Sequence, residues 1–169
     1  VDTEPPGWVK DDDLKHAAET ERLSQYPLEQ FGLWDSLRKK LMAFVEPKKR
    51  KESSKGCPHV HVTHGEQGIG KSAAVTHFVR EKEKDDKNFV FIHHIGASRE
   101  SSQPSCIIRR LAAHLKQKFD IHRPLPGEKQ MFSVPQEFRY WLVELALPKL
   151  QEGGKLFLFF DEIGQINME

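Results

Sequence analysis

Eight consecutive residues, from Gly65 to Ser72, have the types and the spacing that bind a phosphate group. They read GEQGIGKS and fit the pattern G-x-x-x-x-G-K-S, in which glycines let backbone N–H groups turn toward an anion. In this pattern Lys71 reaches the β- and γ-phosphate oxygens, and the Ser72 hydroxyl binds Mg²⁺. The residues that we predict to contact the phosphates are Gly65, Glu66, Gln67, Gly68, Ile69, Gly70, Lys71 and Ser72.

The segments on either side fit the order strand, loop, helix that such a site requires. Residues 58–64 alternate valines with polar residues, which predicts a strand. After the loop, apolar residues recur at helical spacing until the acidic pair at 85–86; they are Ala74, Val75, Phe78 and Val79. A glycine-rich surface turn that happens to carry a lysine would not need these neighbours. We therefore expect residues 65–72 to be a P-loop.

A second stretch could complete a magnesium site. The apolar run KLFLFF at 155–160 predicts a strand, and Asp161 and Glu162 follow at its carboxyl end. A carboxylate at a strand end, well after a P-loop, can hold Mg²⁺ beside Ser72, which is the Walker B pattern. Because any buried strand can end at an acid, this motif gains its meaning from the P-loop before it. We predict that Ser72 and Asp161 bind Mg²⁺.

Helices and strands alternate along the rest of the chain. Helices are predicted over 14–23, over 33–45, from Pro104 onward and after the capping residue Ser133; a buried strand is predicted over 89–95. This alternation indicates an α/β fold with a mainly parallel sheet and flanking helices. We expect a disordered linker over 1–13, a helical lead-in segment with a basic tether over 14–56, and the N-terminal part of a P-loop NTPase domain over 57–169.

Composition limits the other function classes. The 169 residues carry a net charge of +1, which gives no whole-chain case for binding nucleic acid or an anionic membrane. The basic run at 47–56 is more typical of a solvated loop than of a nuclear-import signal. No apolar run approaches the roughly 20 residues that span a bilayer. Cys57 and Cys106 form no CxxC pattern, so we expect neither a disulfide framework nor zinc, and a reducing, cytoplasmic setting.

Four of the histidines in the predicted strands leave a metal site open as an alternative. They are His59, His61, His93 and His94. No acid or cysteine stands at a metal-ligand spacing from them, so ordinary packed or exposed histidines are the favoured interpretation.

The segment FIHHIGASRESSQPSCIIRRLAAHL, together with the P-loop, resembles the STAND-class P-loop NTPases, NACHT- and AAA-like, that carry tetratricopeptide or WD repeats, as in nephrocystin-like proteins. The resemblance rests on an aromatic strand, Gly96, Ser98 and the helix around Arg110, and it covers most of residues 14–168. It implies an ATP-driven switch or assembly scaffold that uses ATP and Mg²⁺ and binds protein partners through repeats outside this chain. It also implies that the chain is a piece of a longer protein and incomplete at its C-terminus, because a strand of the sheet would follow Walker B.

The resemblance leaves turnover open. In the AAA-like register Glu162 directly follows the Walker B aspartate and would activate the attacking water, so it is the predicted catalytic residue. In the NACHT register the acids would stand where Gly164 and Gln165 are, and the chain would be a non-hydrolysing scaffold. A small-molecule kinase is disfavoured, because no lid-like arginine cluster can be read. ATP and GTP are both open, since Leu33 stands where the family often has an arginine near the base.

Overall fold

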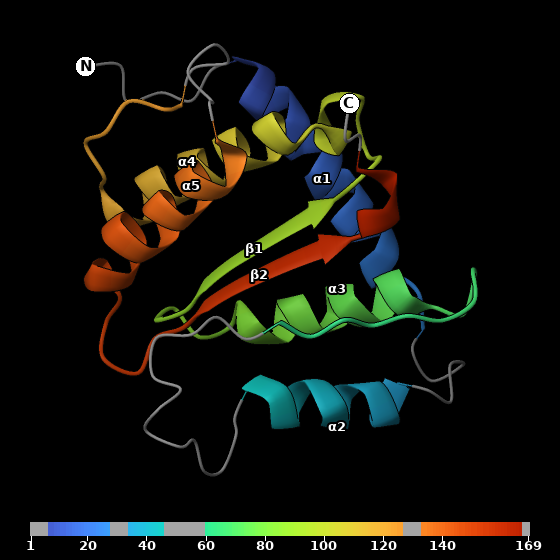
Figure 1. Cartoon of the computed structure of the whole chain (residues 1–169). Coiled ribbons are helices and arrows are strands. Elements are labelled where there is room, and N and C mark those ends of the chain that lie inside the picture. Colours follow the sequence, from blue (N-terminus) through green and yellow to red (C-terminus); the bar gives the residue numbers. More distant parts are fainter. Residues whose placement is uncertain (1–6, 28–33, 46–59, 127–132, 167–169) are drawn as a thin grey trace.

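Two parallel strands run through the centre of the fold (Figure 1). The structure is a computed structural model that describes residues 7–27, 34–45, 60–126 and 133–166. Strand β1 (Phe89–His94) pairs with β2 (Leu156–Asp161), and the register aligns the last residue of β1, His94, with Asp161. The chain between the strands forms helices, as parallel pairing requires. The strand predicted over 89–95 and the one predicted over 155–160 are both confirmed.

One face of the strands is covered by α4 and α5 (Figure 1). Helix α4 (Pro104–Phe119) begins at a proline after Gln103, as predicted, because proline lacks the N–H that a helix start leaves unused. Helix α5 (Val134–Arg139) is capped by Ser133 and continues as a π-helix (Tyr140–Ala146). The buried residues of this layer are Phe89, Phe91, Leu111, Ala112, Leu115, Ile121, Trp141 and Ala146.

The opposite face is covered by α3 (Lys71–Lys82) and, beyond it, by α2 (Trp34–Val45). Alternate residues of a strand point to opposite faces, so Phe157 and Phe159 pack here while their neighbours pack against α4 and α5. The buried centre of this layer is Leu41, Val45 and Phe78. The helix expected over 33–45 is therefore confirmed from Trp34 onward, with its apolar face on the core.

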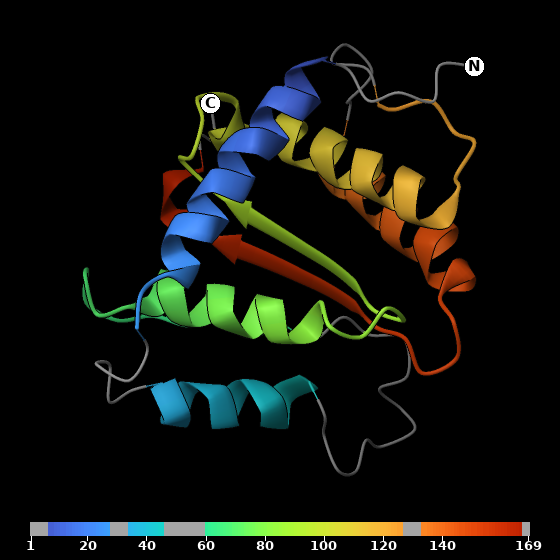
Figure 2. The ribbon, with the colours of Figure 1, turned by 180° about the vertical axis from the view of Figure 1, so that it is seen from behind.

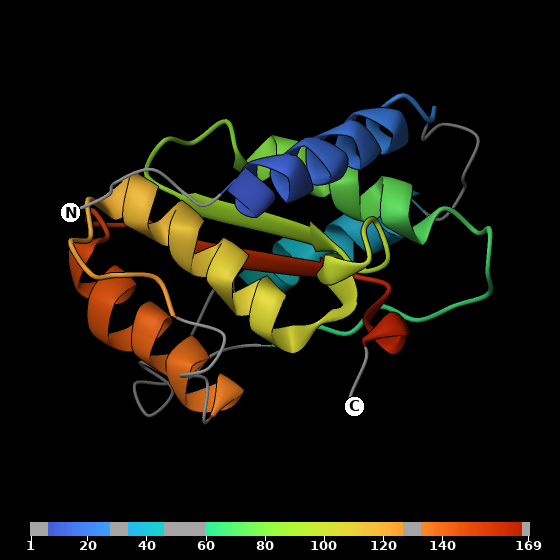
Figure 3. The same cartoon turned by 90° about the horizontal axis from the view of Figure 1, so that it is seen from above.

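Helix α1 (Gly7–Ser24) lies beside β1 and passes close to α3 (Figures 2 and 3). A helix was predicted over 14–23, but α1 begins seven residues earlier, at Gly7. The linker prediction is therefore wrong for residues 7–13. The buried residues of α1 recur at helical spacing, and they are Val9, Asp12, His16, Thr20 and Leu23. Three of the five are polar, so a search for apolar residues misses the first turns.

The strand predicted over 58–64 is not formed by its described part, because residues 60–64 have no regular secondary structure. Val60 is 80% exposed and Val62 is 73% exposed. A strand needs a neighbour to pair its backbone groups, and no strand lies beside this segment among the described residues. The basic tether at 47–56 lies outside the described residues. The P-loop NTPase fold stays a prediction, since two parallel strands and their helices are common to many α/β folds.

Candidate functional site

The glycine loop at 65–72 leads directly into the amino end of α3. Gly68 and Gly70 have φ of 81° and 91°, in the left-handed region that glycine enters without a Cβ clash. Gly70 caps the helix, and its carbonyl accepts the first helical hydrogen bond, from Ala74 N–H at 2.9 Å. The N–H groups of the first helical turn have no acceptor within the helix, so the loop and the helix end together form a place for an anion.

Lys71 folds back onto this loop. Its ammonium group donates to the carbonyl oxygens of Gly65, at 2.9 Å, and of Glu66, at 2.7 Å. The two carbonyls hold the ammonium charge over the loop. A phosphate oxygen could accept a hydrogen bond from the ammonium beside these carbonyls or in place of one of them.

The structure brings together Ser72 and Asp161, the two residues predicted to bind Mg²⁺. The Ser72 hydroxyl, in the first turn of α3, donates to Asp161 Oδ1 at 3.0 Å. Asp161 is the last residue of β2 and shares the sheet face that α3 covers. A hydroxyl and a carboxylate oxygen are the ligand types that Mg²⁺ prefers, so the pair could hold this ion.

At Glu162, the predicted catalytic residue, the backbone turns away from the direction of β2. The φ of Glu162 is 59°, uncommon for a residue with a Cβ, and its side chain is exposed. Its carboxylate accepts a hydrogen bond from the Gln165 side chain, not from a residue of the loop. The Gln165 side chain also fills the space where Gly96 would carry a Cβ. These contacts hold Glu162 beside the end of β1.

A cavity of about 260 Å³ lies next to the loop, between α2 and residues 61–65. Its walls combine apolar and aromatic side chains with a few polar groups, as small-molecule sites commonly do. The lining includes Trp34, Leu37, Lys40, His61, Val62, Ile69, Lys71 and Ala74.

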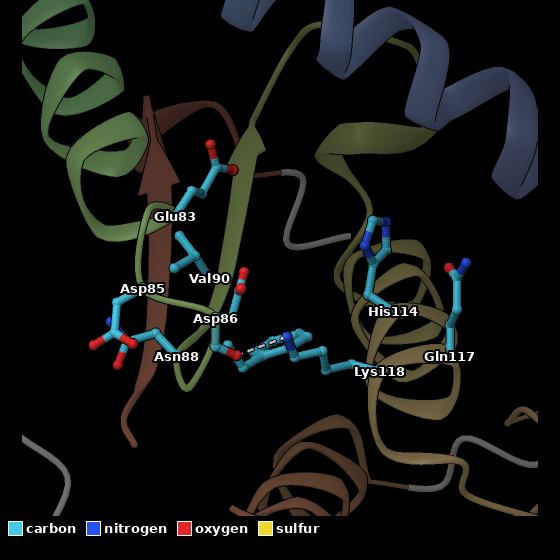
Figure 4. A pocket seen from close by; sticks show the side chains of 9 residues that line it. Glu83, Asp85, Asp86, Asn88, Val90, His114, Gln117 and Lys118 are labelled. Carbon is cyan, nitrogen blue, oxygen red and sulfur yellow. Dashed lines mark hydrogen bonds between the residues drawn. The ribbon is translucent and has the colours of Figure 1, made fainter. Parts of the chain in front are cut away.

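A larger cavity of about 480 Å³ lies at the amino end of β1 (Figure 4). Charged and amide side chains line it, and Lys118 closes one side by donating to the Asp86 carbonyl oxygen at 3.0 Å. In open α/β sheets, ligands bind beyond the carboxyl ends of the strands. The larger cavity lies at the opposite, amino end of β1. The smaller cavity is lined by Gly65, Gly70 and Lys71, so it is the one that we assign to the loop.

Sequence reasoning missed a buried polar cluster where α1, β1 and α4 meet. Arg110, on α4, donates to Asp13 Oδ1 at 2.6 Å and to the Ile92 carbonyl at 2.8 Å. Burial would raise the pKa of Asp12, but hydrogen bonds from His16 and Ser98 and the Arg110 charge outweigh it and hold the pKa at about 2. The i, i+4 spacing of Asp12 and His16 was the signal that could have pointed to this cluster.

Asp12, His16 and His93 come close enough to hold a metal ion, but their hydrogen bonds favour neutral histidines whose ring nitrogens are already used. His16 Nδ1 accepts from His94 N–H at 3.1 Å, so the ring hydrogen of neutral His16 is on Nε2 and no lone pair is left for a metal. His93 Nε2 donates to the Ser101 carbonyl at 2.8 Å, and Arg110 Nη1 lies 3.2 Å from the remaining nitrogen. Burial lowers the pKa of His93 to about 3 and also lowers that of His16.

The histidine metal site considered from the sequence is not formed by those of its histidines that the structure describes. His61 is exposed and packs on Phe44, with ring centroids 5.4 Å apart. His93 bonds Ser101, whereas His94 lies against Asp161. His59 and Cys57 lie outside the described residues.

Comparisons with known proteins add no family to these observations: no family model, curated protein or solved structure matches the chain. Each helix within the described ranges is too short or too polar to cross a membrane.

Proposed function

We propose that this chain binds a nucleoside triphosphate with Mg²⁺ and hydrolyses it slowly, as the switch module of a signalling or assembly protein. ATP is the proposed nucleotide. The loop at 65–72 would hold the phosphates, and Ser72 and Asp161 would hold Mg²⁺. The proposal includes a STAND-type P-loop NTPase fold, a cytoplasmic setting and protein partners bound through repeats outside these residues.

The observation that carries the proposal is the 3.0 Å hydrogen bond between Ser72 and Asp161. The sequence singled out these residues separately, one from a glycine-rich motif and one from a strand end. A chance glycine turn has no reason to place its serine against that carboxylate. The positive φ of Gly68 and Gly70 and the start of α3 at Lys71 add support, because an anion site at a helix end needs both.

The cavity beside the loop supports a nucleotide rather than free phosphate. It adjoins Gly65 and Gly70, and Trp34 offers a flat apolar surface for a base. Its lining does not separate adenine from guanine. Titration with ATP and with GTP, under one set of conditions, decides between them.

Lys71→Ala tests nucleotide binding. Loss of the ammonium group should weaken Mg-ATP binding by about 10- to 100-fold, the effect of one charge-assisted hydrogen bond or slightly more. Isothermal titration calorimetry measures the affinity, and the thermal unfolding midpoint shows whether the variant is folded. Lys84→Ala, at an exposed lysine beyond the end of α3, is the matched control and should bind like the wild type. Equal affinity in both variants would overturn the proposal.

Hydrolysis would depend on Glu162, which stands directly after the proposed Mg²⁺ ligand. A carboxylate at this position can orient and deprotonate water once the Gln165 amide releases it. The hydrogen bond between Glu162 and Gln165 also favours a second candidate, a P-loop scaffold that binds nucleotide without turnover.

Glu162→Gln separates the two candidates, with phosphate release and nucleotide affinity measured on the same samples. A slow hydrolase should lose phosphate release by at least about tenfold and keep its affinity for Mg-ATP. Gln165→Ala should keep or raise the rate, because it frees the carboxylate of Glu162. A wild-type chain that binds Mg-ATP and releases no phosphate is the scaffold.

A further inference from the structure

A buried histidine, His94, lies between the proposed magnesium site and helix α1. It is the last residue of β1 and is 3% exposed. Its Nδ1 lies 3.3 Å from Asp161 Oδ2, and its Nε2 lies 3.0 Å from the hydroxyl oxygen of Thr20. Both ring nitrogens thus face a partner, one on the strand β2 and one on α1.

The Asp161 carboxylate is held at both of its oxygens. Ser72 donates to Oδ1 from α3, and His94 faces Oδ2 from β1. An ionised carboxylate only accepts hydrogen bonds, so the contact with His94 uses hydrogen on Nδ1. A carboxylate held on both sides cannot rotate freely, and its orientation toward a cation on the Ser72 side is set in advance.

Helix α1 fixes the histidine in turn. The Thr20 hydroxyl lies 2.8 Å from the His16 carbonyl oxygen and 3.0 Å from His94 Nε2. A hydroxyl can donate or accept, so Thr20 serves either form of the ring. The His94 backbone N–H donates to the His16 ring, which ties the same residue to α1 a second time.

We propose that His94 is a positioning residue, which orients Asp161 for Mg²⁺ and transmits the position of α1 to the site. The inference rests on the proposed function, because Asp161 is a magnesium ligand only there. It adds that His16 and Thr20, which bond His94 from α1, set how strongly Mg²⁺ promotes nucleotide binding. His94 acts through Asp161 and does not touch the nucleotide.

The test compares ATP affinity in Mg²⁺ with ATP affinity in EDTA; we call the ratio the magnesium increment. His94→Phe keeps the ring volume and removes both nitrogens, and it should reduce the increment about tenfold, the effect of one charge-assisted hydrogen bond. His94→Asn keeps an N–H near the position of Nδ1 and should recover most of the increment. Affinity in EDTA should stay within about threefold of wild type in both variants.

Two variants on α1 extend the test away from the site. Thr20→Val removes the hydroxyl and keeps the shape, and it should reduce the increment about threefold, since it acts through His94. Val9→Ala is the matched control, because Val9 is fully buried on α1 but lies about three helical turns from Thr20. It should lower the unfolding midpoint and leave the increment unchanged.

The outcomes separate this inference from the function on which it rests. A wild-type chain without a magnesium increment overturns both. A wild-type increment that His94→Phe leaves intact overturns the positioning role alone. Equal losses in Mg²⁺ and in EDTA, with no recovery in His94→Asn, also overturn it, because they are what a damaged fold produces.

Discussion

The proposed site is bordered by two regions that are held in different ways. On one side, which we call the α1 side, helix α1, the end of β1 and α4 meet in a buried set of hydrogen bonds. On the other, which we call the loop side, residues 60–70 are mostly exposed and have no strand beside them among the described residues. Asp161, at the end of β2, contacts the first region through His94, and Lys71 directly follows the second.

This difference suggests how the site would work. The carboxylate is held by contacts between distant parts of the chain, so its place is fixed before a ligand arrives. The loop is shaped by its own glycines and by the start of α3, and Lys71 is held by two loop carbonyls. Binding would therefore reshape the loop side and leave the α1 side in place.

The largest expected effect on stability comes from breaking the α1 side at Arg110. Arg110 is 4% exposed, and its guanidinium stacks on Phe91 with 4.8 Å to the ring centroid and donates to Asp13 and to a strand carbonyl. Arg110→Met keeps the packing of the stem but leaves buried partners without a donor. The free energy of unfolding should fall by about 3 kcal/mol, measured by urea denaturation.

Arg80→Met is the control for this prediction. Arg80 also reaches α1, through Glu21 at 3.2 Å, but both side chains are about half exposed. A surface ion pair contributes about 0–1 kcal/mol, so the control should change little. If the two variants lose similar amounts of unfolding free energy, the buried cluster stabilises α1 no more than a surface ion pair does.

A pH titration sharpens the same comparison with a smaller effect. Burial lowers the pKa of His93 to about 3 in the folded chain, against 6.5 for a free histidine. Between these values the unfolded chain binds the proton and the folded chain does not, so stability present above pH 6.5 is lost as the pH falls. The slope is at most about 1.4 kcal/mol per pH unit for one histidine.

His93→Gln isolates that contribution, since glutamine can keep a donor for the Ser101 carbonyl and does not titrate. Urea midpoints at several pH values between 7 and 4 should fall less steeply in the variant than in the wild type. His122→Gln, at a side chain that is 79% exposed, should keep the wild-type slope. Parallel slopes for wild type and His93→Gln would place the acid sensitivity elsewhere in the chain.

On the loop side the structure agrees with one local prediction and disagrees with another, and phosphate binding stays a prediction. The positive φ of Gly68 and Gly70 and the helix that starts after them were readable because they depend on local spacing. The strand at 58–64 was not, because alternation shows which residues suit a strand and says nothing about whether a neighbour is present to pair with it. The strands at 89–94 and 156–161 pair with each other, and both were predicted correctly.

Among the helices, elements marked by local signals were predicted, whereas the buried polar contacts of α1 were missed. Helix α4 and the cap at Ser133 followed from local signals and are confirmed. The first turns of α1, at 7–13, were assigned to a linker, because Asp12 and Asp13 look like surface residues until the fold brings Arg110 against them. Their partners lie far along the chain, so no local pattern gives the pairing.

The smallest expected effect tests whether the loop side is as open as the exposure of its valines indicates. Val62 is 73% exposed, so Val62→Thr should change the free energy of unfolding by less than about 0.5 kcal/mol. The same substitution at Val79, which is fully buried on α3, places a hydroxyl in the core and should cost about 1–3 kcal/mol. Urea denaturation of the two variants gives the comparison. If Val62→Thr costs as much as Val79→Thr, residues 60–64 are packed as an inner strand in solution. The loop would then start from a fixed base, and the contrast between the two regions would disappear.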